Sequence, residues 1–161
     1  MLTFSVNTII DKPVDIVVKA LMDPDNFPFW QTDLERFEII KETPDKVGSI
    51  GHLHYNQKGR TYILEDKMIF CDPGKKYISE VSGYAIKATV ETILNTVDNK
   101  TEMTIKWSGK GNILILKIIF PFLRGNMIKQ SKAELETFKK LVETHGSNFA
   151  EKKKKIFNAF D

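Results

Sequence analysis

The sequence predicts an α+β fold in which a seven-stranded, curved antiparallel sheet wraps around one long C-terminal helix. Apolar and polar residues alternate through the first ten residues and through most of residues 34–109, which is the period of a strand. Turn residues separate the alternating runs, and tight turns connect only antiparallel neighbours. One long stretch near the C-terminus then repeats its apolar residues at helical spacing.

The N-terminal part combines one strand with two short helices. Residues 2–10 alternate and therefore predict a strand. Asp11 can cap a following helix and Pro13 is tolerated in a first turn, so a helix is expected through about Met22. The proline-rich segment DPDNFPFW (23–30) predicts a second short helix or turn, whose three aromatic residues pack against the core.

Six further alternating runs, each ended by turn residues, predict the rest of the sheet. These runs are Arg36–Glu42, Ser49–Gln57, Arg60–Phe70, Lys75–Val81, Tyr84–Val97 and Thr101–Gly109. Within the last two runs one face is apolar and the other is polar, so the sheet is expected to bury a single face. No strands remain to cover that face. The C-terminal third of the chain is therefore the expected cover.

The C-terminal third predicts a long amphipathic helix. Ile113 to Leu123 is almost entirely apolar, but eleven residues are far fewer than the ~20 that span a bilayer. Pro121 is expected to kink or delay the helix, and His145-Gly146 to end it. The apolar stripe of this helix consists of Met127, Ile128, Leu135, Phe138, Leu141 and Val142.

Residues 1–147 are therefore expected to form a single domain, followed by a short basic amphipathic helix over residues 148–161. Asn148 and Glu151 have the spacing of a capping box. An apolar edge lies beside four consecutive lysines and consists of Phe149, Ile156, Phe157 and Phe160. Two interpretations remain open for residues 148–160: the apolar edge docks on the domain, or it makes weak contact with an anionic membrane.

Charge and cysteine content exclude several classes of protein. The net charge is +3, and residues 124–161 hold nine Lys/Arg against five Asp/Glu. The remaining body is close to neutral, whereas a nucleic-acid binder usually carries a basic stripe there, so no nucleic-acid partner is expected. The single Cys71 cannot form an internal disulfide and no secretion signal opens the sequence, which predicts a cytoplasmic location. The sequence carries no signal of oligomeric state.

Motifs for metal, nucleophilic and phosphate chemistry are not recognisable. His52 and His54 lie two apart on one strand and are expected to face solvent, with no third ligand at a recognisable spacing. No Gly-x-Ser-x-Gly is present, and the glycine-rich residues 108–111 lack the Walker pattern. We therefore expect no metal and no cofactor.

Polar residues on the apolar face of the sheet are the better candidates. If Leu64, Met68 and Phe70 point inward, Tyr62 and Asp66 point inward too. Asp66 is then the candidate catalytic residue, because a buried carboxylate has a perturbed pKa. The alternative is a strand bulge that returns Asp66 to solvent. The ligand-binding candidates are Tyr55, Tyr62, Asp66, Tyr84, Trp107, Phe120 and Met127. The aromatic ones could equally be ordinary core residues.

The order of elements and several local motifs resemble the START/Bet v 1-like (SRPBCC) helix-grip superfamily, in particular its polyketide cyclase/dehydrase and lipid-transport-like branch. The resemblance covers about residues 2–145. The residues that carry it are TIIDKPVDIVVKALMDPDNFPFW, Val47-Gly48, Asp72-Pro73-Gly74 and PFLRGNMIKQSKAELETFKKLVE. None of these is a catalytic motif, and one scaffold of this kind supports many functions.

The resemblance and the apolar inner face together leave two functions open. The first is the binding or transport of a hydrophobic small molecule or lipid in a cavity between sheet and helix. The second is a metal-free cyclase/dehydratase-type enzyme acting on a poly-keto or aromatic substrate, in which Tyr, Asp or Arg would assist proton transfer. Arg36, Arg60 and Arg124 all lie at the ends of expected elements, which favours the binding protein.

Overall fold

The computed structural model describes residues 1–159 and contains one seven-stranded antiparallel sheet with the strand order β1-β7-β6-β5-β4-β3-β2. The strands are β1 (Leu2–Ile10), β2 (Leu34–Lys41), β3 (Ile50–Gln57), β4 (Arg60–Asp72), β5 (Lys76–Ser82), β6 (Ile86–Val97) and β7 (Lys100–Gly111). The helices are α1 (Val14–Met22), the 3-10 helix η1 (Pro24–Asn26), α2 (Phe27–Trp30), α3 (Leu114–His145) and α4 (Phe149–Asn158). The predicted fold class is confirmed.

Local sequence explains why the sheet is a meander. In β1, Leu2, Phe4 and Val6 are buried while the residues between them are exposed. The β3–β4 turn at residues 58–59 and the β6–β7 turn at residues 98–99 have positive φ at both positions. Such turns match the right-handed twist of paired strands, so each connects two antiparallel neighbours directly.

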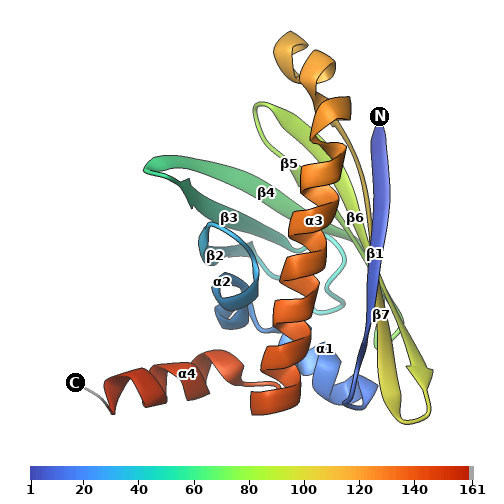
Figure 1. Cartoon of the computed structure of the whole chain (residues 1–161), viewed down its shortest axis with the longest axis vertical. Coiled ribbons are helices and arrows are strands. Elements are labelled where there is room, and N and C mark those ends of the chain that lie inside the picture. Colours follow the sequence, from blue (N-terminus) through green and yellow to red (C-terminus); the bar gives the residue numbers. More distant parts are fainter. Residues whose placement is uncertain (160–161) are drawn as a thin grey trace.

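The long helix α3 crosses the concave side of the sheet and packs mainly along β1 (Figure 1). It begins at Leu114 and continues through Pro121, so the proline does not delay its start. It ends at His145, and the following Gly146 has a φ of 76°, in the left-handed region that favours glycine. The core between the sheet, α1 and α3 has its largest fully buried side chains at Phe138, Phe149, Ile10, Met103, Leu135, Val17 and Val142.

The cap predicted at Asp11 is wrong, and the one predicted at Asn148 has the expected position but not the capping hydrogen bond. Pro13 is the residue that precedes α1, and the backbone N–H of Asp11 instead donates to Glu143 Oε1 over 2.8 Å. Asn148 precedes α4 without a side-chain capping bond. The polar anchor of this region is Asn26, which is fully buried in η1. Its side chain bonds the backbone on three sides, through Ala20 O, Ser147 O and Ala150 N.

The start of α4 docks on the domain, whereas contact of its remainder with a membrane stays a prediction. Phe149 is fully buried and packs edge-on against Phe138, with 6.1 Å between ring centroids. Phe157 is 71% exposed and Ile156 is also exposed. Phe160 lies outside the described residues. Among the apolar residues of α4, those of the first turn are thus the ones buried against the body, while Lys153 Nζ of the second turn lies 5.9 Å from the centroid of the Phe29 ring. The boundary proposed after residue 147 stays a prediction.

Candidate ligand-binding cavity

A cavity of about 460 Å³ lies between the inner face of the sheet, the middle of α3 and the short helices after β1. Strands β3 to β7 supply its floor, and Leu21, Phe27 and Trp30 supply one wall. Met127 and Glu134 of α3 also line the cavity. The volume falls in the range of small-molecule sites, roughly 300–1,000 Å³.

Aromatic residues form the wall near β2. Phe27 meets Phe37 edge-on with 5.0 Å between ring centroids, and Trp30 meets Phe138 in the same way at 5.1 Å. Gly51 makes this wall possible, because a Cβ at that position would lie only 1.9 Å from the Phe37 ring. The glycine therefore lets an aromatic ring of β2 lie directly over β3.

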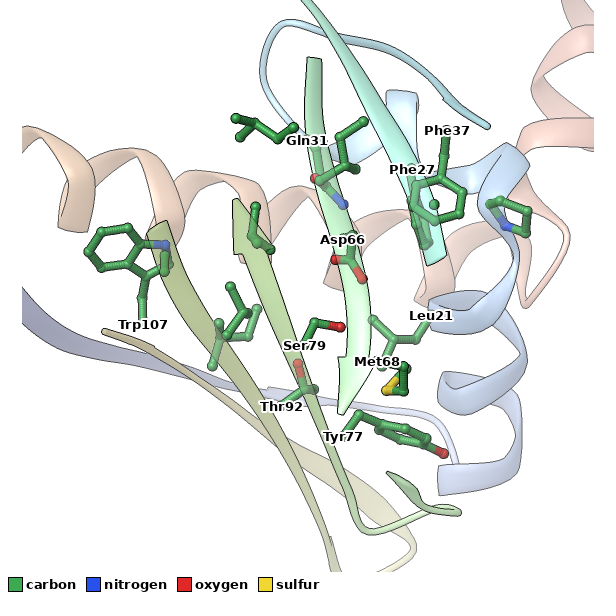
Figure 2. A pocket seen from close by; sticks show the side chains of 18 of the residues that line it. Leu21, Phe27, Gln31, Phe37, Asp66, Met68, Tyr77, Ser79, Thr92 and Trp107 are labelled. Atoms are coloured by element: carbon green, nitrogen blue, oxygen red, sulfur yellow. The ribbon is translucent and has the colours of Figure 1, made fainter. Parts of the chain in front are cut away.

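Three polar side chains cross the otherwise apolar floor. Asp66 of β4, Ser79 of β5 and Thr92 of β6 all line the cavity and lie near one another (Figure 2). Burial raises the pKa of Asp66 to about 6, and a hydrogen bond with Ser79 acts in the opposite direction. The floor therefore carries one carboxyl group that changes its protonation state close to neutral pH. We call these three residues the polar strip.

The inward orientation of Asp66 follows from its register. Asp66 pairs with Gly51 on one side and Val81 on the other, both of which line the cavity. A bulge does exist in β4, but it falls between Met68 and Phe70, beyond Asp66. It turns Phe70 outward, where this side chain is 44% exposed, so the expectation that Phe70 points inward is wrong.

The three tyrosine candidates occupy different positions. Tyr55 lines the cavity, and burial raises the pKa of its hydroxyl. Tyr62 stacks on Tyr55 with 5.1 Å between ring centroids, but it is 43% exposed near the end of the sheet and lies outside the cavity lining. Tyr84 is 89% exposed, so its expected inward orientation is wrong. The reason is the turn closed by the Gly83 N–H to Ile86 O bond, which interrupts the alternation before β6 begins.

Trp107 and Met127 line the cavity, whereas Phe120 lies behind it. The Trp107 ring is held between Phe4, stacked at 5.5 Å, and Phe120 at 5.7 Å. Phe120 is buried, but it supports Trp107 without joining the lining. Of the candidates taken from the sequence, the structure brings together Tyr55, Asp66, Trp107 and Met127. Their roles in binding stay predictions.

Sequence reasoning missed several polar residues of the lining. Glu134 accepts hydrogen bonds from the Thr32 backbone N–H and from Gln130 Nε2, at 2.9 and 3.0 Å. Trp30 also lines the cavity, and its buried Nε1–H has no hydrogen-bond partner among residues 1–159. Strand alternation could have identified Ser79, because Ser79 shares a face of the sheet with Val81. Glu134 could not be identified in this way, because helical spacing alone does not show which side of α3 faces the cavity.

A second cluster lies on the outer face of the sheet. Ligand atoms of Glu38, His52 and His54 all lie within 4.8 Å of one another, so the expectation that no third candidate ligand accompanies the histidines is wrong. Glu38 lies in β2 and pairs with His52 of β3. The spacing of residues within one strand cannot reveal a neighbour that comes from another strand. His54 Nε2 lies 2.7 Å from Glu38, and this hydrogen bond holds the pKa of the carboxyl below its usual range.

The Arg36 guanidinium, 3.5 Å from Glu38, already supplies a positive charge to the cluster of Glu38, His52 and His54. That charge opposes the binding of a cation, and the expectation of no metal stays a prediction.

Within the described part of the chain, none of the helices combines the length and the apolar character that crossing a membrane requires.

Comparison with known proteins gives matches only at the level of structure. No protein-family model and no curated protein matches the sequence. A conserved protein from Geobacillus kaustophilus is similar over 90% of this chain and 97% of its own, with a TM-score of 0.72 and 16% identity. The Zhui aromatase/cyclase from a Streptomyces species matches over 86% of this chain and 91% of its own, with a TM-score of 0.70 and 15% identity.

A START superfamily protein from Mycobacterium smegmatis is similar over 83% of this chain and 97% of its own, with a TM-score of 0.63 and 10% identity. Identities this low establish a shared fold and leave the activity open. The strand order, the position of α3 and these neighbours agree with the resemblance drawn from the sequence. The chain therefore has the helix-grip fold of the START/Bet v 1-like superfamily.

Proposed function

We propose that the protein binds a hydrophobic small molecule or lipid in the cavity between the sheet and α3. The observation that carries the proposal is the composition of the lining, in which aromatic and aliphatic side chains are the majority and surround the short polar strip. Further polar side chains, among them Lys41, Lys46 and Glu134, complete the lining. A ligand with a large apolar body and few polar atoms matches such a lining. An apolar ligand would also bury surface that is otherwise in contact with water.

The polar groups suggest how such a ligand is oriented. Ser79 and Thr92 donate or accept hydrogen bonds, and Asp66 donates one when it is protonated. These three side chains can form hydrogen bonds only with a ligand that carries polar atoms, so we expect the ligand to carry at least one hydrogen-bonding group.

A cyclase/dehydratase-type enzyme acting on a poly-keto or aromatic substrate is the second candidate. It is favoured by Asp66, whose pKa of about 6 suits a group that exchanges protons near neutral pH. One of the structural neighbours is named an aromatase/cyclase. No arginine of residues 1–159 lines the cavity, and we therefore rank catalysis below binding.

Binding of the fluorescent probe anilinonaphthalene sulfonate, together with native mass spectrometry of the purified protein, tests the proposal. Val90→Trp fills the cavity, and Ala88→Leu repeats the test with a smaller gain in volume. The matched control is Ile63→Trp, since Ile63 is exposed on the outer face of β4. We expect the two cavity variants to lose the probe and any retained hydrophobic molecule, while the control keeps both.

Probe binding that survives Val90→Trp and Ala88→Leu in folded protein would contradict the proposal, as would a wild-type protein that binds no probe. A retained compound that the protein releases unchanged supports a binding protein. A compound that is converted to a product supports the enzyme instead.

A further inference from the structure

The first turns of α3 carry a row of large apolar side chains on the side that faces solvent. These side chains are between 42% and 83% exposed. We call them the apolar face; they are Leu114, Ile115, Ile118, Ile119 and Phe122. Residues four apart lie one above another on a helix, so the five form one continuous surface.

The opposite side of the same turns is also apolar. Phe120 is buried against Trp107, and Leu123 packs against the core. Leu116 lies so close to the chain at Gly111 that a Cβ on this glycine would approach the Leu116 Cβ to 2.6 Å. A helix that is apolar on all sides is normally covered on all sides. The protein itself covers only one side of this segment.

The cavity does not explain the apolar face, because none of its five residues lines the cavity. The first turns of α3 project beyond the strands, at the end of the molecule opposite to α4 (Figure 1). Contiguous exposed apolar surface of this kind marks an interaction site. The partner must therefore be able to approach this end of the molecule.

The charges around the apolar face indicate which partner fits. Residues 114–133 of α3 contain four Lys/Arg and no Asp/Glu. Lys117 and Arg124 are exposed and lie seven residues apart, on one flank of the apolar face. Lys129 continues the exposed side about two turns further, seven residues after Phe122. Two copies packed through this face would bring these like charges together, whereas an anionic lipid surface attracts all of them.

We propose that the apolar face docks on anionic lipid bilayers, with the first turns of α3 lying in the plane of the interface. The segment is too short to span a bilayer, which agrees with the lack of a spanning helix among the described residues. The five apolar side chains enter the boundary between headgroups and acyl chains, and Lys117 and Lys129 reach the lipid phosphates. This docking does not depend on what the cavity binds.

Vesicle flotation of the full chain tests the proposal, with vesicles of phosphatidylcholine alone and of equal parts phosphatidylcholine and phosphatidylserine. The double variant Ile118→Ser/Phe122→Ser removes apolar contact, and Lys117→Glu/Lys129→Glu inverts charge. Ile156→Ser/Phe157→Ser is the matched control, because it removes the same two residue types, also exposed, beside the lysines of α4.

The wild type is expected to bind the anionic vesicles more strongly than the neutral ones, and less strongly as salt is added. Burial of two large apolar side chains corresponds to a change of about tenfold or more, so the serine variant should partition at least that much more weakly. The charge-inverted variant should lose its preference for anionic vesicles. The α4 variant should bind as the wild type does. Circular dichroism verifies that each variant is folded.

Three outcomes would overturn the proposal. The first is a wild type that does not bind anionic vesicles at low salt. The second is binding that the α4 variant loses and the Ile118→Ser/Phe122→Ser variant keeps, which would assign membrane contact to α4. The third is a dimer in sedimentation velocity that Phe122→Ser disrupts, which would assign the apolar face to a second copy of the chain.

Discussion

The N-terminal and C-terminal halves of α3 are both helical, but their solvent-exposed sides differ in polarity. In the C-terminal half, Leu135 and Phe138 are buried while charged residues such as Glu136 and Lys140 face solvent. In the N-terminal half the buried side carries Phe120, but the exposed side carries the apolar face, with Phe122 83% exposed. The C-terminal half is amphipathic in the usual sense, and the N-terminal half is not.

This difference shows that one helix performs two tasks. Most of the α3 residues that are buried in the core or line the cavity lie in the C-terminal half, so the stability of the domain and the shape of the cavity account for the residues of that half. The exposed side of the N-terminal half contributes little to that stability, because its side chains remain in water. An apolar surface that the fold does not require is best explained by a partner.

The largest expected effect is a difference in the free energy of unfolding between one substitution in each half of α3. Phe138→Ala removes a fully buried ring that contacts Trp30 and Phe149, and should lower the free energy of unfolding by about 3–5 kcal/mol. Phe122→Ala should change it by no more than about 0.5 kcal/mol, because that ring is exposed. Urea unfolding followed by circular dichroism measures both. Similar losses in the two variants would mean that the N-terminal half packs against the domain in solution.

The second prediction concerns the cavity that the C-terminal half closes. Burial raises the pKa of Asp66 from 3.8 to about 6, so the folded state binds this proton more tightly than the unfolded state does. The group therefore favours folding at low pH, and this contribution is lost as the pH rises from about 4 through about 6. Asn at position 66 cannot ionise, so Asp66→Asn does not lose stability in this pH range. Its stability relative to the wild type should increase by on the order of 2 kcal/mol between about pH 4 and about pH 8.

Urea titrations of both proteins at the two pH values measure this change. Glu38→Gln is the matched control, because the pKa of Glu38, on the outer face of the sheet, is lowered by its hydrogen bond with His54. Glu38→Gln should not gain stability relative to the wild type as the pH rises. A stability difference between Asp66→Asn and the wild type that is independent of pH would mean that Asp66 is solvated in the folded protein.

The smallest expected effect concerns polar side chains in each half. Glu134 accepts a hydrogen bond from the backbone of Thr32, so Glu134→Ala should lower the free energy of unfolding by about 1 kcal/mol. Lys117→Ala should leave thermal stability unchanged, since Lys117 is exposed and surface substitutions stay within about 0.5 kcal/mol. Thermal unfolding of the two variants measures both changes in stability. A larger loss from Lys117→Ala would show that the first turns of α3 make polar contacts that stabilise the fold.

Much of the fold and part of the site could be predicted from the sequence. The period-two alternation of β1 predicted which of its residues are buried, and turns such as residues 58–59 predicted an antiparallel meander. The same alternation predicted that Asp66 faces inward if the strand is regular, and the structure places it in the cavity. These properties are local, because they depend on residues close together in the chain.

The tertiary structure decided the rest. The bulge that turns Phe70 outward arises in the pairing of β4 with β5, and Glu38 joins the two histidines only because β2 pairs with β3. The different exposure of the two halves of α3 depends on where the sheet ends, since both halves contain apolar residues at helical spacing. Periodicity shows which residues share a face, whereas the elements packed against that face determine whether it is core, cavity or exposed surface.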